Sequence, residues 1–195
     1  SRAALPPGAR IGTSAPRRAA QALHLRPDCT VVSFRGNVAT RLGKLEAGEA
    51  DVTLLAAAGL NRLGKADLGV RLDPVDWLPA PGQGAIAIEC RADDAATLGL
   101  LSSIDHAPSP AAPQVDRAAL MAERALLGAL GGNCHSPIAV LTTHDADRLT
   151  MRGAIFTLDG RERVEATHNF ALDDSSGPVI LARHLLGIAS PAIKE

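Results

Sequence analysis

Leu130-Gly131-Gly132-Asn133-Cys134-His135-Ser136-Pro137-Ile138 is the stretch that decides how the second half of this chain folds. The run 118–129 before it has helical apolar spacing, and the run 138–143 after it is extended. The paired glycines tolerate the left-handed backbone with which many helices end. Pro137 then prevents the helix from resuming. The sequence therefore predicts a loop between a helix and a strand, with Cys134 within reach of a ligand.

Cys134 has two interpretations at this point. Free cysteines are most often buried and behave as small hydrophobic side chains. A thiol on a loop between two fixed elements can instead act as a nucleophile or an attachment point. His135 suggests activation of the thiolate, but adjacent residues in a chain often point apart. The loop alone leaves both interpretations open.

Composition limits the class of protein. The 195 residues can form one large or two small domains, and 46% hydrophobic with 21% charged residues is typical of a soluble globular protein. A net charge of -1 and only 2% aromatic residues argue against nucleic acid as a partner. No run approaches the roughly 18 apolar residues of a membrane span, and no signal peptide is recognised, so we expect no membrane partner.

The three cysteines are far apart in the sequence and form no CxxC pair. Their odd number and wide spacing predict reduced thiols and a cytoplasmic protein. Cys90 follows apolar residues and is expected in the core. The six histidines form no HxxxH or HExxH pair, so we expect no metal site.

The first third of the chain alternates strand and helix signals. The expected strands are 10–14, 30–34 and 52–56, and the expected helices are 17–25, 38–46 and 59–63. This alternation predicts an α/β fold with a mostly parallel sheet and crossover helices.

Arginines occupy equivalent places in that pattern, at strand ends or in the first turns of helices: Arg17, Arg18, Arg35, Arg41 and Arg62. The carboxyl ends of strands and the following helix starts form the ligand crevice of an open α/β sheet. Helix N-termini favour anions, and guanidinium groups bind carboxylates or phosphates in two-point geometry. Any single surface arginine can be incidental, but five at equivalent positions indicate a cradle for several anions.

The middle of the chain reads as a connection. The proline-rich stretch 73–81 predicts a hinge, and Trp77 within it is expected to anchor packing. An apolar strand over 85–90 and a helix over 93–103 follow. The segment 105–113, with three prolines, is a second linker.

The last third predicts a small α+β domain. Extended runs over 138–143, 149–158 and 163–171 are separated by turn residues, which is typical of an antiparallel meander. A final helix is expected over 178–189. Two helices would then cover three strands.

Six motifs follow one another in a fixed order: Gly12-Thr13-Ser14 with Arg17-Arg18, Arg35-Gly36-Asn37-Val38 with Thr40-Arg41-Leu42, Ala58-Gly59-Leu60 with Arg62-Leu63, Gly82-Gln83-Gly84-Ala85, Ala122-Glu123-Arg124, and 131–138 around Cys134. Together they resemble the later two-thirds of the porphobilinogen deaminase (hydroxymethylbilane synthase) family of tetrapyrrole biosynthesis. The resemblance runs through nearly the whole chain.

The resemblance implies a transferase that holds a dipyrromethane cofactor through a thioether to Cys134. Such an enzyme adds four porphobilinogen units to this primer with loss of ammonia, and hydrolyses off linear hydroxymethylbilane. Because each pyrrole carries acetate and propionate groups, the implied cofactor-binding residues are Cys134, Ser14, Arg17, Arg18, Arg35 and Arg41. The implied substrate-binding residues are Thr13, Arg62 and Gln83.

The chain departs from the family at two places. Ala15 stands where the family commonly has a second serine. Most of the family's first domain, with the aspartate of its Lys-Asp motif, has no counterpart here, so no catalytic residue is assigned. We expect an α/β domain over 1–79 resembling a periplasmic-binding-protein lobe, a hinge and return segment to the first domain over 80–106, and a C-terminal α+β domain over 107–195.

The strand expected over 85–90 would complete the absent domain's sheet, so we expect it to be exposed, to pair again within the chain, or to pair with a separate N-terminal domain or a second copy. Two other functions stay open: a non-catalytic module that binds carboxylates or other anions, and a redox-sensing thiol. The cysteine loop separates the first of these from the transferase, since a binding module needs no tethering thiol.

Overall fold

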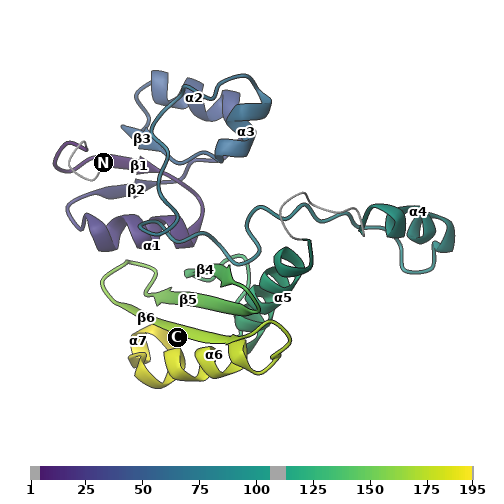
Figure 1. The fold of residues 1–195 in the computed structure, drawn as a ribbon. Coiled ribbons are helices and arrows are strands. Elements are labelled where there is room, and N and C mark those ends of the chain that lie inside the picture. Colours follow the sequence, from purple (N-terminus) through teal and green to yellow (C-terminus); the bar gives the residue numbers. More distant parts are fainter. Residues whose placement is uncertain (1–4, 106–112, 195) are drawn as a thin grey trace.

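The computed structural model describes residues 5–105 and 113–194, and these ranges form two three-stranded sheets (Figure 1). The first is parallel, with the order β2-β1-β3, and contains β1 (Arg10–Gly12), β2 (Thr30–Val32) and β3 (Val52–Thr53). The second is antiparallel, with the order β4-β5-β6, and contains β4 (Ile138–Asp145), β5 (Arg148–Phe156) and β6 (Arg163–Ala171). The expected parallel α/β unit followed by an antiparallel meander is confirmed.

The helices of these ranges are α1 (Pro16–Leu25), α2 (Val38–Glu46), α3 (Ala57–Arg62), α4 (Ala95–Asp105), α5 (Pro113–Ala129), α6 (Gly177–Ile188) and α7 (Pro191–Lys194). The expected helices all form, with small differences at their ends. The short α7 was not expected from the sequence. Strand β3 is shorter than expected, with two residues in place of the five predicted over 52–56.

Local chemistry explains where the helices begin and end. Pro16 occupies the first turn of α1, where its missing N–H needs no partner. The Asn37 side chain caps α2 by accepting a 2.9 Å hydrogen bond from the Thr40 backbone N–H. Gly131 ends α5 with φ +66°, and the Gly132 N–H donates to the Leu127 carbonyl at 2.9 Å.

Helix α1 lies between the two sheets (Figure 1). Toward the parallel sheet, Ile11 and Ala22 share a small core against which Trp77 packs, as expected of a packing anchor. Toward the antiparallel sheet, Ala20 packs with Phe156. Helices α2 and α3 lie beyond the parallel sheet, and α5 and α6 cover the opposite face of the antiparallel sheet.

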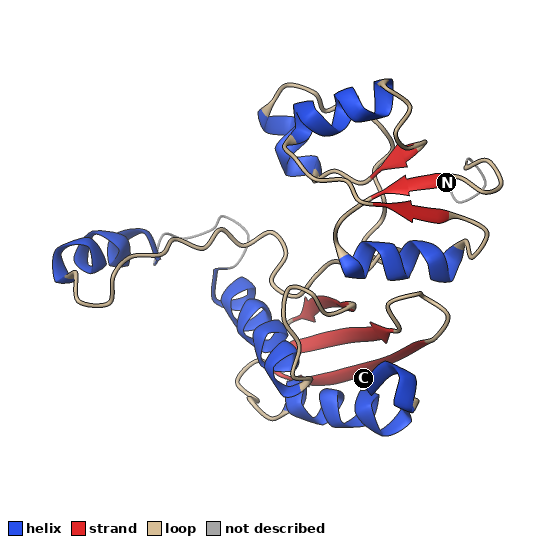
Figure 2. Ribbon diagram, turned by 180° about the vertical axis from the view of Figure 1, so that it is seen from behind, coloured by secondary structure: helices blue, strands red, loops and turns tan. Residues whose placement is uncertain are grey.

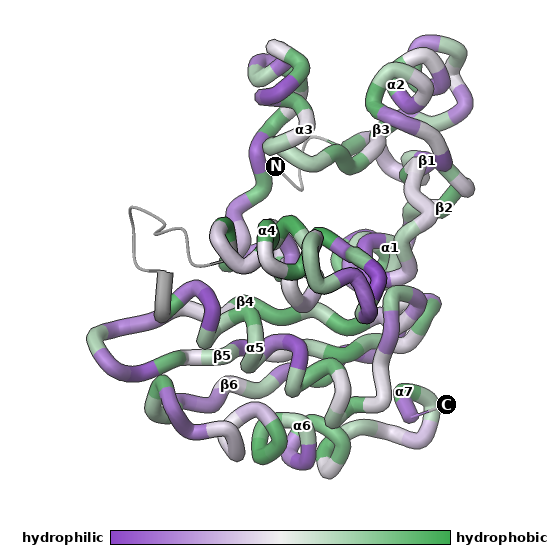
Figure 3. Tube along the Cα trace, turned by 90° about the vertical axis from the view of Figure 1, so that its right-hand side faces the viewer, coloured by the Kyte–Doolittle hydropathy of each residue, from purple (hydrophilic) through white to green (hydrophobic). Residues whose placement is uncertain are grey.

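The first residues of β4 are apolar on both faces. Ile138 and Val140 point into the core under α5 and α6, whereas Ala139 and Leu141 point toward α1. Figure 3 shows the hydrophobic colour continuing along this strand. A strand buried on both sides loses the usual alternation, which explains the unbroken apolar run in the sequence.

The strand expected over 85–90 is absent, and that prediction was wrong. These residues form no strand, and Ile86 and Ile88 are 74% and 59% exposed. A strand needs a neighbour for its N–H and C=O groups, and none of the described strands lies beside this segment. Cys90 is therefore only half-buried, not in the core as expected.

The segment 85–105 extends away from both sheets and carries α4 at some distance from the rest of the protein (Figure 2). Leu98, Leu100 and Ile104 of α4 are exposed. Most of the linker expected over 105–113 lies outside the described residues.

The turn between β5 and β6 presses against α1. The Nδ1 atom of His24 lies 3.0 Å from the Gly160 carbonyl oxygen, and the His24 ring meets the edge of Phe156. A Cβ atom on Gly160 would lie 2.5 Å from the Ala20 carbonyl oxygen, and the residue has φ +71°. Only glycine fits this contact between the two sheet units.

We therefore expect Gly160→Ala to lower the free energy of unfolding by about 2–4 kcal/mol, from left-handed strain and overpacking together. Urea unfolding measures the change. Gly43→Ala is the control, because Gly43 lies in α2 with open space around it and the change should stabilise by up to about 1 kcal/mol. A neutral Gly160→Ala would contradict the close packing of the turn on α1.

Candidate functional site

A pocket of about 290 Å³ opens where β2 and β3 lead into their following helices. Its lining residues are Arg18, Gly36, Asn37, Val38, Arg41, Leu55 and Ala56. They come from the start of α1, the segment after β2 with the first turns of α2, and the segment after β3. The pocket thus lies at the carboxyl ends of parallel strands, where open α/β sheets bind their ligands.

Two guanidinium groups give this pocket a positive charge. Arg18 donates a 3.0 Å hydrogen bond to the Leu54 carbonyl, and Arg41 Nε donates to the Gly36 carbonyl at 2.9 Å. Burial lowers the pKa of Arg18, and the charge of Arg41 lowers it further. Neither arginine forms an ion pair with the acidic side chains of the described ranges. An anion in the pocket would supply the missing negative charge.

Arg17 faces another direction, toward the chain that connects the two sheets. Its side chain is buried, and it donates to the Leu78 carbonyl at 2.6 Å and more weakly to the Gln83 side-chain oxygen at 3.5 Å. Burial, followed by repulsion from Arg18, lowers the pKa of Arg17 to about 10. The two neighbouring arginines of α1 therefore point to different places: Arg18 lines the pocket, and Arg17 contacts residues 78 and 83 instead.

Thr13 and Ser14 shape the backbone at the end of β1. Thr13 is buried, and its hydroxyl accepts a 3.2 Å hydrogen bond from the Ala15 N–H. Ser14 is exposed, and its hydroxyl accepts from the Phe34 N–H at 3.0 Å and shares a hydrogen bond with Ser33. These bonds tie the end of β1 to the segment after β2.

The position before Thr13 requires glycine because Phe34 leaves no room for a side chain there. The Phe34 ring lies directly over Gly12, and a Cβ atom at this position would fall 2.7 Å from the ring carbons. Phe34 is fully buried, so its ring has no room to move aside. The first glycine of the Gly-Thr-Ser motif thus allows the ends of β1 and β2 to approach closely.

The other expected site residues are more exposed. Arg35 follows β2 and Arg62 ends α3; neither makes a hydrogen bond or an ion pair with the described residues, so both guanidinium groups face solvent. Gln83 lies in the turn after the hinge, where its side-chain oxygen also accepts from the Ala80 N–H at 3.4 Å. The structure thus brings Arg18 and Arg41 together, and Arg17 and Gln83 together, and leaves Arg35 and Arg62 apart.

Cys134 is exposed on a loop, as the sequence predicted. The Asn133 N–H donates to the Ser136 hydroxyl at 3.0 Å, and the His135 N–H donates to the Asn133 side-chain oxygen at 2.8 Å. These bonds close the loop on itself between α5 and β4. The thiol is thereby presented to solvent on a fixed turn, where a covalently attached group can extend from it.

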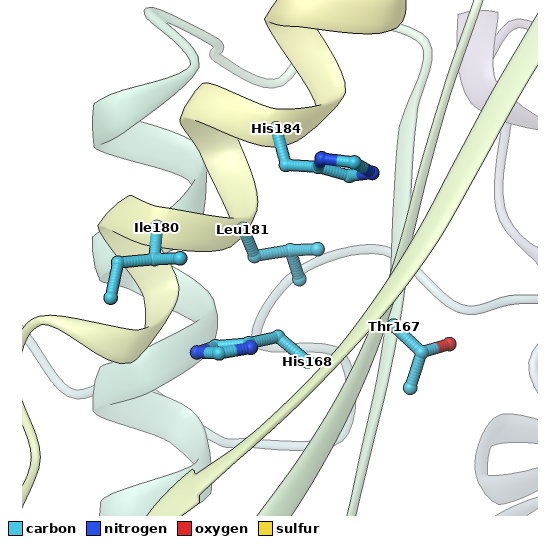
Figure 4. A pocket seen from close by; sticks show the side chains of 5 residues that line it. All are labelled: Thr167, His168, Ile180, Leu181 and His184. Atoms are coloured by element: carbon cyan, nitrogen blue, oxygen red, sulfur yellow. The ribbon is translucent and has the colours of Figure 1, made fainter.

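A smaller pocket of about 220 Å³ lies between β6 and α6 (Figure 4). His168 and His184 are among its lining residues, but Leu181 lies between them and their imidazole rings point in opposite directions. Across residues 5–105 and 113–194, no three His, Cys, Asp or Glu side chains are grouped to hold a metal ion. No helix in these ranges is long and apolar enough to cross a membrane.

Sequence reasoning missed the apolar side of the arginine pocket. Leu55 and Ala56 line it directly after β3, and Asn37 both lines it and caps α2. Leu55 and Ala56 fell inside the strand expected over 52–56 and were therefore assigned to the sheet, and a capping asparagine carries no charge that singles it out as a ligand contact. Glu123, which contacts the hinge, was also not identified as a site residue.

Comparison with known proteins places these features in a family. Residues 1–99 match the family model described as "Porphobilinogen deaminase, dipyromethane cofactor binding domain", and residues 118–185 match the model of the C-terminal domain of the same enzyme. The chain belongs to the porphobilinogen deaminase family. The cofactor in the first description is the dipyrromethane that the sequence resemblance implied.

Three similar relatives carry the name porphobilinogen deaminase. The protein of Sphingopyxis alaskensis is 52% identical over 192 residues, covering 98% of this chain and 58% of the relative. The Roseiflexus protein is 48% identical over 160 residues, covering 82% and 50%. A Xanthomonas oryzae protein is 43% identical over 173 residues, covering 88% and 55%. The chain thus spans about half the length of these porphobilinogen deaminases.

Multivalent anions should stabilise the protein through the arginine pocket, because a bound anion offsets the repulsion between Arg18 and Arg41. Citrate at one hundred times its Kd would add about 2.7 kcal/mol to the free energy of unfolding. Thermal unfolding in citrate and in chloride at equal ionic strength measures this gain. Arg18→Gln and Arg41→Gln should each remove most of it, whereas Arg124→Gln, on the exposed face of α5, should keep it. An equal gain in all variants would exclude the pocket.

Proposed function

We propose that this chain forms the cofactor-holding part of a hydroxymethylbilane synthase. That enzyme condenses four porphobilinogen molecules, with loss of ammonia, onto a dipyrromethane primer and releases linear hydroxymethylbilane. The observation that carries the proposal is a pocket with two guanidinium groups and no carboxylate from the described residues, in a chain that also exposes a loop cysteine. An acid-bearing group tethered to sulfur requires both features.

The residues present fit this cofactor. When bound, dipyrromethane supplies the pyrrole ring to which the first porphobilinogen is joined. Cys134 Sγ provides the thioether bond, and Arg18 and Arg41 bind carboxylates of the acetate and propionate groups. We also assign Ser14, Arg17 and Arg35 to the cofactor, and Thr13, Arg62 and Gln83 to the incoming porphobilinogen. None of these six lines the pocket in this structure, so their contacts would form only with the ligand in place.

Each class of side chain has a distinct task. The guanidinium groups hold several carboxylates at once, which keeps intermediates bound as the product lengthens. The Cys134 thiolate is the nucleophile that makes the covalent tether. No residue of this chain is assigned as the proton donor or acceptor of the deamination, which we place in a family segment outside this sequence.

We further propose three regions: an α/β domain over 1–79, related in design to a periplasmic-binding-protein lobe, a hinge and return segment over 80–106, and a C-terminal domain over 107–195. The parallel order β2-β1-β3 supports the first, and the extension of 85–105 away from both sheets supports the second. A non-catalytic anion-binding module is less favoured, because it would not need the exposed cysteine loop.

The covalent tether can be tested by intact-protein mass. We expect this chain, co-expressed with the remaining segment of a family member in a haem-synthesising host, to gain the mass of two linked pyrroles and to consume porphobilinogen. Cys134→Ser should abolish both, while Cys29→Ser and Cys90→Ser should retain the added mass. Porphobilinogen consumption without any mass on Cys134 would overturn the assigned tether.

The extended segment 85–105 is proposed to bind a separate N-terminal domain or, in its absence, a second copy of this chain. Its exposed Ile86, Ile88 and Leu100 support this, since several large apolar side chains exposed on one segment mark an interaction surface. We expect light scattering to show self-association that Ile86→Lys with Ile88→Lys reduces. A monomer at all concentrations, with unchanged hydrogen exchange in 85–90 on adding the domain, would contradict the proposal.

A further inference from the structure

The segment 75–83, here called the strap, is bonded to both sheet units. Its Leu78 carbonyl accepts from Arg17 at 2.6 Å and from the Gln21 side chain at 3.0 Å, which ties it to α1. Its Pro79 carbonyl accepts from the Val140 N–H at 2.9 Å, which ties it to β4. The Leu78 side chain is also buried between these elements. The strap is therefore the connection through which the two units can influence each other.

Glu123 of α5 holds the far end of the strap. Its Oε2 atom accepts a 2.7 Å hydrogen bond from the Gly82 N–H. Burial raises the pKa of Glu123, and none of the described lysines or arginines forms an ion pair with it. The Thr142 hydroxyl faces the carboxylate but completes no hydrogen bond of ordinary geometry. The Thr142 backbone N–H also faces the carboxylate, so Glu123 connects the Gly82 turn to β4.

Gly82 is followed by Gln83, whose side chain contacts Arg17. The turn closes through a 3.0 Å hydrogen bond from the Gln83 N–H to the Ala80 carbonyl. In this turn the Gln83 side-chain oxygen lies 3.5 Å from Arg17 Nη2. Gly82 has φ +69°, and a Cβ atom there would lie 3.3 Å from Leu120 of α5, so the turn fits closely against that helix.

We propose that Glu123 is a positioning residue that sets, through Gly82, where Gln83 meets Arg17. A hydrogen bond to a charged acceptor is stronger than one between neutral groups, so the carboxylate fixes the turn better than water would. The C-terminal unit thereby controls the direction of a guanidinium that belongs to the α/β unit. The value of this link for cofactor binding rests on the proposed function, whereas the link itself does not.

The first test follows the Gly82 amide and the Arg17 side chain by NMR in the complete 195-residue chain. We expect Glu123→Ala to speed hydrogen exchange of the Gly82 amide by about tenfold or more and to move the Arg17 Nε–Hε resonance. Glu123→Gln should restore both, because its amide oxygen still accepts from Gly82. Met121→Ala, on the exposed side of α5, is the control and should change neither.

The second test separates positioning from general loosening. In a Gln83→Ala background, Glu123→Ala should produce no further shift of the Arg17 resonance, since the connecting side chain is already gone. An additional shift there, or an unchanged Gly82 amide in Glu123→Ala alone, would overturn the inference. Absence of citrate stabilisation in the unmodified chain would instead count against the proposed function and leave this link intact.

Discussion

The burial of Arg17 against the Leu78 carbonyl is the interaction on which the arrangement of the two sheets depends. A guanidinium removed from water needs acceptors, and here a neutral carbonyl supplies the best of them. Burial, followed by repulsion from Arg18, lowers the pKa of Arg17 to about 10. The same bond fixes the Leu78 side chain in the core shared by α1 and the antiparallel sheet.

Helix α1 can serve both sheets because small residues face the contacts. Ala20 is fully buried against the antiparallel sheet, and Gly160 brings the β5–β6 turn within contact of the α1 backbone. Close backbone approach leaves little freedom for sliding between the units at this point. The strap crosses beside this contact, and its hydrogen bonds at Leu78 and Gly82 lie on either side of Pro79 and Pro81.

Local signals allowed much of the fold to be predicted. Asn37, Pro16 and Gly131 define helix ends by their own chemistry, and those ends were placed within a few residues. The expected strand over 85–90 failed because strand formation depends on a neighbour, which apolar composition does not reveal. The split between Arg17 and Arg18 follows from the 100° turn between successive helix residues. The contact from Glu123 to Gly82 spans 41 positions and leaves no local signal.

The Cys134 loop shows why the two units must act together. Its hydrogen bonds are internal, so the ends of α5 and β4 determine where the thiol lies. The pocket arginines belong to α1 and α2, on the other unit. A group that is bonded to the thiol and held by those arginines would connect both units, and its binding energy would favour the arrangement in which both contacts form. Glu123 holds the strap at Gly82, and Arg17 holds it at Leu78. Binding of the proposed cofactor would therefore be coupled to the packing between the two sheets.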